Sequence, residues 1–410
     1  MNAIILAVGD ELLTGQCIDT NSAHLSRELA ERGIATAAHW TVGDDRAAIA
    51  AALSAAAGQA DLLLVTGGLG PTPDDLTRQG LADAMHVELR LNEDCLKEIE
   101  EFFRRRGRTM QPANAIQAMC PEGAEALPNR MGTAPGIAAR LGGTRVYVMP
   151  GVPEEMVWMY RDVIAPRLGS QDGVILCRTV HTFGQGESDI AARIADLMTR
   201  GASPAVGTTV AAGLVTVRIV ARGADRADAE RQADAAAETI RRRLGEMVVG
   251  EGEETMASAV GELLRRHGRT LAVAESCTGG LVGQIITSSP GASEYFRGGV
   301  ISYADPAKRD LLDVSEEVIR RCGAVSEEVA RAMADGARRR FDSHWALGIT
   351  GVAGPAGGSR DKPVGLVWIA LAGPGGTECA RHVFGGSRET VRLRAALTAL
   401  NALRLRLLRA

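Results

Sequence analysis

The chain has 410 residues, of which 46% are hydrophobic and 23% charged, and its formal net charge is -4 at pH 7. This length predicts two or three domains, and the composition is typical of a globular protein. The weak negative charge and an aromatic content of 3% argue against a surface that binds nucleic acids or membranes, because such surfaces need clustered positive charge or stacking rings. We therefore expect neither nucleic acid nor a membrane as a partner.

The cysteines and the N-terminus indicate a cytoplasmic protein. The seven cysteines form no CxxC pair and are not clustered with histidine, so neither a disulfide framework nor a zinc site is expected. Residues 1–9 lack the basic start of a signal peptide and run directly into a strand pattern. No apolar run approaches the ~20 residues that a membrane-spanning helix requires.

Residues 1–168 are expected to form the first domain. Apolar runs at residues 3–8, 34–42 and 61–66 predict buried strands, and helical patterns lie between them. Strands that alternate with helices predict a parallel α/β sheet covered by helices, in which ligands bind at the carboxyl ends of the strands.

The loops after these strands carry glycines and carboxylates. Gly67, Gly68 and Gly70 follow the third strand and precede a helix, which is the geometry of a phosphate cradle. Asp44 follows the second strand and Asp75 follows the glycines, and carboxylates beside a phosphate usually hold a divalent metal or orient a water. Taken singly, such aspartates are ordinary helix N-caps. Several such loops at one sheet edge favour a binding site.

Residues 169–252 are expected to form a smaller α+β domain. Its pattern predicts a strand, a helix, two strands joined around Gly213 and a second helix at residues 227–244. Asp225 is a candidate N-cap of that helix. His181 lies on the first strand, where a structural role is the default expectation.

Residues 253–410 are expected to form the last domain, organised around Ala274-Glu-Ser-Cys-Thr-Gly-Gly280. Residues 270–273 predict the end of a buried strand, and residues 281–287 predict a helix. The unpaired N–H groups at the start of that helix favour a negative charge, and Gly279 and Gly280 would let a ligand approach the backbone. The alternative is a helix capped by a serine or threonine, without a ligand.

Ser276 is the candidate nucleophile within this stretch. A serine nucleophile needs a base for its proton and donors for an oxyanion. The three histidines of the domain lie in no motif, whereas its only lysines, Lys308 and Lys362, lie beside motif residues. A lysine serves as a base when burial lowers its pKa. Surface positions for both lysines stay open, and Cys277 is either a rival nucleophile or a core residue.

Three further features belong to the same domain. Tyr303 orients the serine and the lysine, stacks on a ligand ring, or packs in the core. The loop at residues 351–363, which includes Gly351 and Gly354, is either mobile or a lid over a ligand. A helix predicted at residues 388–408 begins with Arg388 and Arg392, which either meet a phosphate or belong to a solvated helix face.

The motifs of the first domain resemble two related families. The glycine loop with its aspartates resembles the MoaB/Mog-like molybdopterin-binding fold. Leu69 stands where the cofactor-synthesis enzymes usually have threonine, and together with Gly9-Asp-Glu-Leu-Leu13 it points to the N-terminal domain of the CinA (competence/damage-inducible) family. In that family the middle segment is a KH-like linker. Gly184-Gln-Gly186 followed by Glu187 is not the basic Gly-x-x-Gly loop with which KH domains clamp nucleic acids.

The last domain resembles the CinA C-terminal domain, the nicotinamide mononucleotide deamidase. The resemblance rests on residues 275–280, on Tyr303 with Lys308, and on Thr350-Gly-Val-Ala-Gly-Pro355. It implies that Ser276 attacks the carboxamide, that Lys308 acts as its base and that Tyr303 and Thr350 assist, with no cofactor. The resemblance covers nearly the whole chain, in the expected order.

The resemblance therefore implies a bifunctional enzyme of pyridine-nucleotide salvage. The last domain would hydrolyse nicotinamide mononucleotide to nicotinate mononucleotide and ammonia. The first would hydrolyse ADP-ribose to AMP and ribose 5-phosphate, with a divalent metal ion such as Mg²⁺ at Asp44 and Asp75. The residues expected to contact the two substrates are Gly67, Gly68, Gly70, Thr278, Gly279, Gly280, Gly351, Gly354, Arg388 and Arg392. We also expect a homodimer.

Two alternatives stay open. In the first, the N-terminal domain binds a molybdopterin or a nucleotide without turning it over. In the second, the protein is a scaffold in competence or recombination that binds DNA or protein. The net acidity and the lack of a basic stripe argue against DNA binding.

Overall fold

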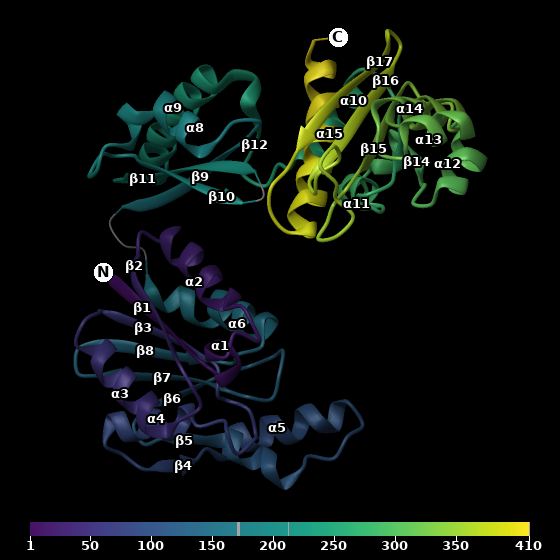
Figure 1. Cartoon of the computed structure of the whole chain (residues 1–410). Coiled ribbons are helices and arrows are strands. Elements are labelled where there is room, and N and C mark those ends of the chain that lie inside the picture. Colours follow the sequence, from purple (N-terminus) through teal and green to yellow (C-terminus); the bar gives the residue numbers. More distant parts are fainter. Residues whose placement is uncertain (170–172, 212, 410) are drawn as a thin grey trace. The chain divides into compact units, whose positions relative to one another are not determined.

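The structure is a computed structural model that describes residues 1–169, 173–211 and 213–409 (Figure 1). The chain packs into two compact units. The first comprises Met1–Leu176 and Ala221–Gln232, and the second comprises Cys177–Val220 and Ala233–Ala410. None of the helices in these described ranges has the length and apolar character that crossing a bilayer requires.

The first unit is built on a six-stranded sheet of order β2-β1-β3-β8-β7-β6. Its strands are β1 (Asn2–Val8), β2 (Ala35–Val42), β3 (Leu62–Thr66), β6 (Glu125–Leu127), β7 (Gly136–Leu141) and β8 (Thr144–Met149). The first three strands and β8 are parallel, as the sequence predicts. By contrast, β7 pairs antiparallel with both β8 and β6. The sheet is therefore rich in parallel strands, and the two residues between β7 and β8 allow only a hairpin at that edge.

Helices cover both faces of this sheet. The α-helices of this part of the chain are α1 (Asp10–Leu13), α2 (Thr20–Ala30), α3 (Arg46–Ala57), α4 (Thr77–Met85), α5 (Glu93–Arg105), α6 (Pro153–Met159) and α7 (Ala165–Leu168). One apolar core contains side chains of α2 and α6, and the other contains side chains of α3 and α4. Asp45 caps α3 by accepting from the N–H of Ala48. The cap of α2 is Asp19. A small ribbon, β4 (Leu89–Leu91) and β5 (Met119–Pro121), completes this part.

The middle segment has the strand and helix order that its sequence predicts, with one strand added. Its elements are β9 (Val174–Phe183), α8 (Glu187–Arg193), β10 (Ala205–Ala211), β11 (Leu214–Gly223), α9 (Arg226–Leu244) and β12 (Val248–Glu251). The strands form a sheet of order β10-β11-β9-β12. Both ring nitrogens of His181 have partners, the hydroxyl of Thr216 at 3.0 Å and the carbonyl of Gly252 at 2.8 Å. This histidine therefore has a structural role.

The last part carries a five-stranded sheet of order β14-β13-β15-β16-β17. Its strands are β13 (Leu271–Glu275), β14 (Phe296–Ile301), β15 (Trp345–Gly351), β16 (Leu366–Gly373) and β17 (Gly376–Val383), and its helices are α10 (Met256–Arg266), α11 (Leu281–Thr287), α12 (Asp305–Leu312), α13 (Glu316–Cys322), α14 (Glu327–Arg340) and α15 (Arg388–Leu408). The strands β14, β13 and β15 run parallel, so their carboxyl ends lie at one edge. α14 packs in the core on one face, whereas α10, α11 and α15 pack on the other.

The helix α15 links the last sheet to the middle segment. Phe183 and Val249 of the middle segment share the core to which α15 contributes. Near the end of the helix, Arg404 is buried and donates to the carbonyls of Val248 at 3.0 Å and Glu246. Burial lowers the pKa of this guanidinium. The buried charge thus depends on backbone carbonyls that lie about 150 residues earlier in the chain.

Candidate functional site

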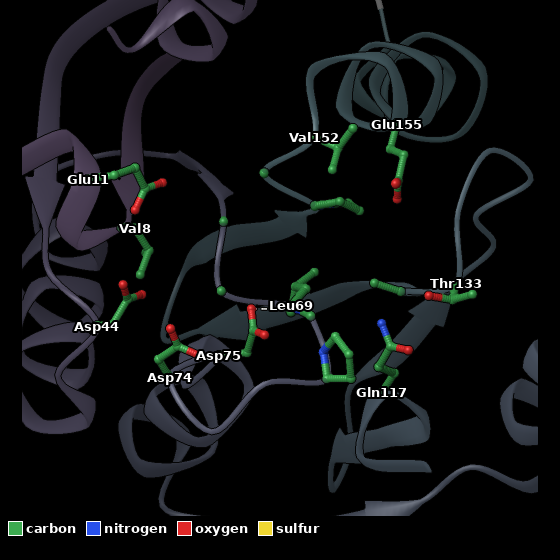
Figure 2. A pocket seen from close by; sticks show the side chains of 18 residues that line it. Val8, Glu11, Asp44, Leu69, Asp74, Asp75, Gln117, Thr133, Val152 and Glu155 are labelled. Atoms are coloured by element: carbon green, nitrogen blue, oxygen red, sulfur yellow. Dashed lines mark hydrogen bonds between the residues drawn. The ribbon is translucent and has the colours of Figure 1, made fainter. Parts of the chain in front are cut away.

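A cavity of about 460 Å³ opens at the carboxyl ends of β1, β3 and β8 (Figure 2). The residues that line it are Val8, Gly9, Glu11, Asp44, Gly67, Gly68, Leu69, Gly70, Pro71, Asp74, Asp75, Gln117, Thr133, Ala134, Pro150, Gly151, Val152 and Glu155. The glycines and both aspartates that the sequence singled out are among them. In Figure 2 Glu11, Asp44 and Asp74 lie across the cavity from Gln117 and Thr133.

The glycine loop after β3 has no room for side chains. A Cβ on Gly67, whose φ is 107°, would lie 2.1 Å from the carbonyl oxygen of Val8. A Cβ on Gly68, whose φ is 63°, would lie 2.1 Å from the hydroxyl of Thr77. Glycine is therefore required at both positions, and the backbone itself forms the floor of the cavity.

Two charged side chains hold this loop in shape. The carboxylate of Asp75 accepts from the N–H of Gly70 at 2.7 Å and of Thr72 at 2.8 Å, and also from the Thr72 hydroxyl. Arg78 is buried beneath the loop and donates to the carbonyls of Leu69 and Gly70. Burial lowers the pKa of Arg78 to about 10. Both oxygens of Asp75 bond within the loop, so this carboxylate braces the glycine loop.

Asp44 lies on the opposite wall and exchanges hydrogen bonds with Asp10. The N–H of Asp10 donates to the Asp44 carboxylate at 3.0 Å, and the N–H of Asp44 donates to the Asp10 carboxylate at 3.1 Å. Burial raises the pKa of Asp44, and the nearby carboxylates of Asp10, Glu11 and Asp74 raise it further. Asp10 belongs to the Gly9-Asp-Glu-Leu-Leu13 motif that the sequence places after β1, although its pairing with Asp44 was not predicted.

The charge of this cavity fits a ligand that arrives with a cation. Its lining includes Glu11, Asp44, Asp74, Asp75 and Glu155 but no lysine, arginine or histidine. In the described part of the chain, no three or more His, Cys, Asp or Glu residues form a cluster that suits a metal ion by itself. Mg²⁺ is usually held by one or two carboxylates together with ligand phosphates and water. Asp44 lies at the cavity wall, and it is the carboxylate that could share such an ion with a ligand.

A second site lies at the carboxyl ends of β13, β14 and β15. The N–H of Ser276 donates to the carbonyl of Ile349 at 2.9 Å, and the N–H of Ser302 donates to the carbonyl of Glu275 at 2.8 Å. The turn that starts at Ser276 is thereby tied to both neighbouring strands. The hydroxyl of Thr350 donates to the carbonyl of Ala324 at 2.7 Å.

The start of α11 is occupied by a side chain of the protein itself. Glu275 is 1% exposed, and its carboxylate accepts from the N–H groups of Gly280 at 3.0 Å, Val282 at 3.1 Å and Gly283 at 2.9 Å. The expectation that a ligand's negative charge binds at this helix start is therefore corrected, because Glu275 already supplies that charge. The sequence feature that could have predicted this arrangement is the acidic residue directly before the serine, because it lies within reach of the helix start.

Lys308 is buried at the first turn of α12. Its side chain is 1% exposed, and Nζ donates to the carbonyl of Tyr303 and to the carboxylate of Asp305, each at 3.2 Å. The surface alternative for this lysine is thereby excluded. No hydrogen bond joins Lys308 to Ser276 anywhere in the described residues, and the Ser276 hydroxyl makes none there to any other group.

The two arginines at the start of α15 bind the motif loops. Arg388 donates to the carbonyl of Gly354 at 2.8 Å and to the hydroxyl of Tyr303 at 2.9 Å. Arg392 donates twice to the carbonyl of Thr278, at 3.1 and 2.7 Å. Tyr303 is 59% exposed, which excludes the core-packing alternative for its ring. The arginines thus gather the serine turn, the tyrosine and the glycine-rich loop at one place.

The remaining predicted residues lie in the same turn and loop. Gly279 and Gly280 have φ values of 61° and 93°, and Gly351 ends β15. Cys277 is 5% exposed, and burial raises its pKa to about 12. A thiol of this kind forms little thiolate at neutral pH, which weakens the case for Cys277 as the nucleophile. Lys362 donates to the carbonyl of Cys322 at 2.8 Å.

The fold and the two sites define a multidomain α/β protein with one ligand cavity in a MoaB-like domain and a serine turn in a separate C-terminal domain. Family comparisons agree with this division. The profile described as "Probable molybdopterin binding domain" matches residues 4–170, "Damage-inducible protein CinA KH domain" matches residues 177–250, and "CinA C-terminal domain" matches residues 253–407. The chain belongs to the CinA family.

Two full-length relatives support that assignment. A "CinA-like protein" of Gloeobacter violaceus is 45% identical over 98% of this chain and 96% of its own length. A protein of the same name from Geobacter metallireducens is 43% identical over the full length of both chains. Among solved structures, a CinA protein of unknown function from Thermoplasma acidophilum is 34% identical, covers 40% of this chain and 96% of its own, and has a TM-score of 0.38.

The electrostatic environment of Asp44 predicts a pH-dependent gain of stability in Asp44→Asn. The pKa of this carboxyl is raised above its ordinary 3.8 on folding, so its contribution to stability is present below about 3.8 and is lost as the pH rises through the folded pKa. At pH 7 the variant should therefore have the higher urea midpoint, and the difference should shrink as the pH falls toward 4. A difference that does not depend on pH would contradict this account.

Proposed function

We propose that the protein is a bifunctional hydrolase of pyridine nucleotides. The C-terminal domain hydrolyses nicotinamide mononucleotide to nicotinate mononucleotide and ammonia, and the N-terminal domain hydrolyses ADP-ribose to AMP and ribose 5-phosphate. Membership of the CinA family supports the proposal, and so does the arrangement of the motif residues. The observation that carries the first activity is the gathering of the Ser276 turn, Tyr303 and the Gly354 loop by Arg388 and Arg392.

The deamidation is proposed to begin at Ser276. Its hydroxyl makes no hydrogen bond in the described structure and is therefore available to a substrate. The oxygen bonds to the carboxamide carbon as the proton passes to Lys308, and the C–N bond breaks as that proton goes to the departing ammonia. Water then cleaves the ester and releases nicotinate mononucleotide.

The developing oxyanion requires donors near the serine. The backbone N–H groups of Cys277 and Thr278 follow it directly, and in the described residues neither donates to another protein group. An N–H from the residue after the nucleophile is a common oxyanion donor in serine hydrolases. The bonds from Arg392 to the Thr278 carbonyl would fix the orientation of these amides. In this proposal Arg392 positions the turn, and Arg388 positions Tyr303.

The proposed ADP-ribose hydrolysis takes place in the acidic cavity. The backbone of Gly68 and Leu69 faces the cavity with N–H groups that have no partner in the described residues, which suits a phosphate. Asp44 would share a divalent ion with the phosphates of the ligand, and that ion, when bound, neutralises phosphate charge and activates a water. Asp75 and Arg78 keep the loop in the shape that this binding needs.

The nucleophile is tested by Ser276→Ala and Cys277→Ala in the full-length protein. Ser276→Ala should abolish ammonia release from nicotinamide mononucleotide while the protein stays folded, because only one hydroxyl is removed. Cys277→Ala should keep most of the activity, since the buried thiol is protonated at neutral pH. Circular dichroism serves as the folding control. An inactive Cys277→Ala that is folded, beside an active Ser276→Ala, would make the thiol the nucleophile.

The base is tested by Lys308→Arg and Lys308→Ala. Arginine keeps the positive charge but does not lose a proton near neutral pH, so both variants should lose on the order of 10²-fold or more in deamidation rate. Near wild-type activity in Lys308→Arg would show that the residue supplies only charge, to a substrate phosphate or to Asp305.

The first site is tested by a matched pair of neighbouring aspartates. Asp44→Asn should lower ADP-ribose hydrolysis at least ~100-fold, because it removes a charge that faces the cavity. Asp45→Asn should keep the activity, since Asp45 caps α3 and asparagine is an equally good cap. Deamidation should be unchanged in both. ADP-ribose that binds to the wild type with Mg²⁺ but is never cleaved would instead establish a binding module without turnover.

A further inference from the structure

Three residues with hydroxyl side chains follow the parallel strands of the last sheet at the same level. Glu275 on β13 pairs in register with Ile301 on β14 and with Ile349 on β15. The residues that come next on the three strands are Ser276, Ser302 and Thr350. The N–H groups of Ser276 and Ser302 extend this register by one hydrogen bond each, at 2.9 and 2.8 Å. Because neighbouring strands lie about 4.8 Å apart, Ser276 has a hydroxyl-bearing residue next to it on both sides.

The side chains of Ser276 and Ser302 point to the face of the sheet that α12 and α14 cover. Side chains alternate between the two faces along a strand. Ala274 and Val300 pack in the core that α14 helps to form. Ser276 and Ser302 follow them by two positions and therefore share that face. Cys277 lies in the core on the opposite face, as the alternation requires. The helix α12 packs against both β14 and α14 (Figure 1), so it lies on the side to which the two serines point.

Lys308 is buried on this same side of the sheet. It lies on α12 one turn before Leu312, which belongs to the core shared with α14. Its Nζ donates to the carbonyl of Tyr303, the residue directly after Ser302, at 3.2 Å. The amine is thus held beside the chain at Ser302, whereas no hydrogen bond joins it to Ser276 in the described residues. A hydroxyl between the two groups would let a proton pass from one to the other.

The hydroxyl of Ser302 is free for such a transfer. It is 0% exposed and has no hydrogen-bond partner in the described part of the chain. By contrast, the Thr350 hydroxyl already donates to the carbonyl of Ala324. The Thr278 hydroxyl is also unpaired there, but Arg392 of α15 binds the carbonyl of this residue, on the face opposite to α12. Because a buried hydroxyl without a partner costs stability, a role in the reaction accounts for a serine at position 302, where an alanine would lose no bond.

We propose that Ser302 relays the proton between Ser276 and Lys308. The inference rests on the proposed deamidase function and adds one residue to its proton path. As the Ser276 oxygen bonds to the carboxamide carbon, its proton passes to the Ser302 oxygen, and the Ser302 proton passes to the lone pair of the Lys308 amine. The electron pair of the carbonyl bond moves to the oxyanion. When that pair returns, the C–N bond breaks, and Lys308 gives the proton back through Ser302 to the departing nitrogen, which leaves as ammonia.

Two buried serines, each replaced by alanine in the full-length protein, separate a relay from a structural role. Ser302→Ala should lower kcat for nicotinamide mononucleotide on the order of 10²-fold and leave KM unchanged, because its hydroxyl relays a proton and does not hold the substrate. Its urea midpoint should match or exceed that of the wild type, since no hydrogen bond is lost.

Ser343→Ala is the matched control and should show the opposite pattern. Ser343 lies directly before β15, at the end of the strand away from the site, and its hydroxyl donates to the carbonyl of Trp345 at 2.9 Å. Losing this bond should lower the urea midpoint and leave the activity unchanged. A fully active Ser302→Ala, or one that loses stability together with activity, would overturn the proposal.

The reactivity of Ser276 gives a measurement that does not depend on the substrate. Methanesulfonyl fluoride forms an O–S bond with an activated serine as fluoride leaves, and peptide mass spectrometry follows this labelling at Ser276. Ser302→Ala should slow the labelling about as much as it slows deamidation. In mixtures of H₂O and D₂O, the wild-type labelling rate should fall along a curve as the deuterium fraction rises, because two protons move together. A linear fall would show a single proton transfer and overturn the relay.

The two measurements also separate this inference from the proposed function. Labelling of Ser276 that depends on Ser302, in a protein that releases no ammonia from nicotinamide mononucleotide, would refute the proposed substrate and leave the relay intact. Deamidation that needs Ser276 but not Ser302 would refute the relay alone. A wild type that shows neither labelling nor deamidation would refute both.

Discussion

The buried carboxylate of Glu275 shapes the C-terminal site. It faces three backbone N–H groups at the start of α11 and is removed from water, so each bond replaces solvation that the buried groups have lost. Leaving such groups unpaired costs about 1–3 kcal/mol each, which commits the turn after β13 to one conformation. That conformation presents Ser276 at the sheet edge. It also means that the start of α11 is already paired with a carboxylate of the protein.

In the N-terminal site, two residues of opposite charge hold the backbone of the glycine loop in place. Asp75 accepts from the loop amides, and the buried Arg78 donates to the loop carbonyls. In both sites, charged residues next to the glycines hold the backbone, while the groups suited to chemistry, Asp44 and Ser276, are free of such bonds to the loop they serve. Because other residues hold the loop, a carboxylate such as Asp44 can stay in surroundings that raise its pKa, and the backbone of the site keeps its shape.

Local patterns predicted the elements well, because apolar spacing and capping residues act over a few positions. The helices α11 and α15 cover the residues that the sequence pattern predicted for them. The partners of the site residues were not predictable in this way. Arg392 donates to the carbonyl of Thr278, which lies 114 residues earlier in the chain, and the sequence around these two residues does not indicate the contact. The sequence likewise did not predict that the carboxylate of Glu275 accepts hydrogen bonds from the start of the helix that follows it.

The anchoring of Arg404 bears on how the protein can be divided. This guanidinium is buried against the carbonyls of Glu246 and Val248, which precede the segment matched by the C-terminal family profile. A fragment that begins at residue 253 would retain the arginine and lose both acceptors, which leaves a buried cation without partners. The activity measured for such a fragment would therefore reflect the lost stability around Arg404 as well as the chemistry of the serine turn. A fragment that begins at residue 177 keeps the acceptors, and with them the helix that carries Arg388 and Arg392.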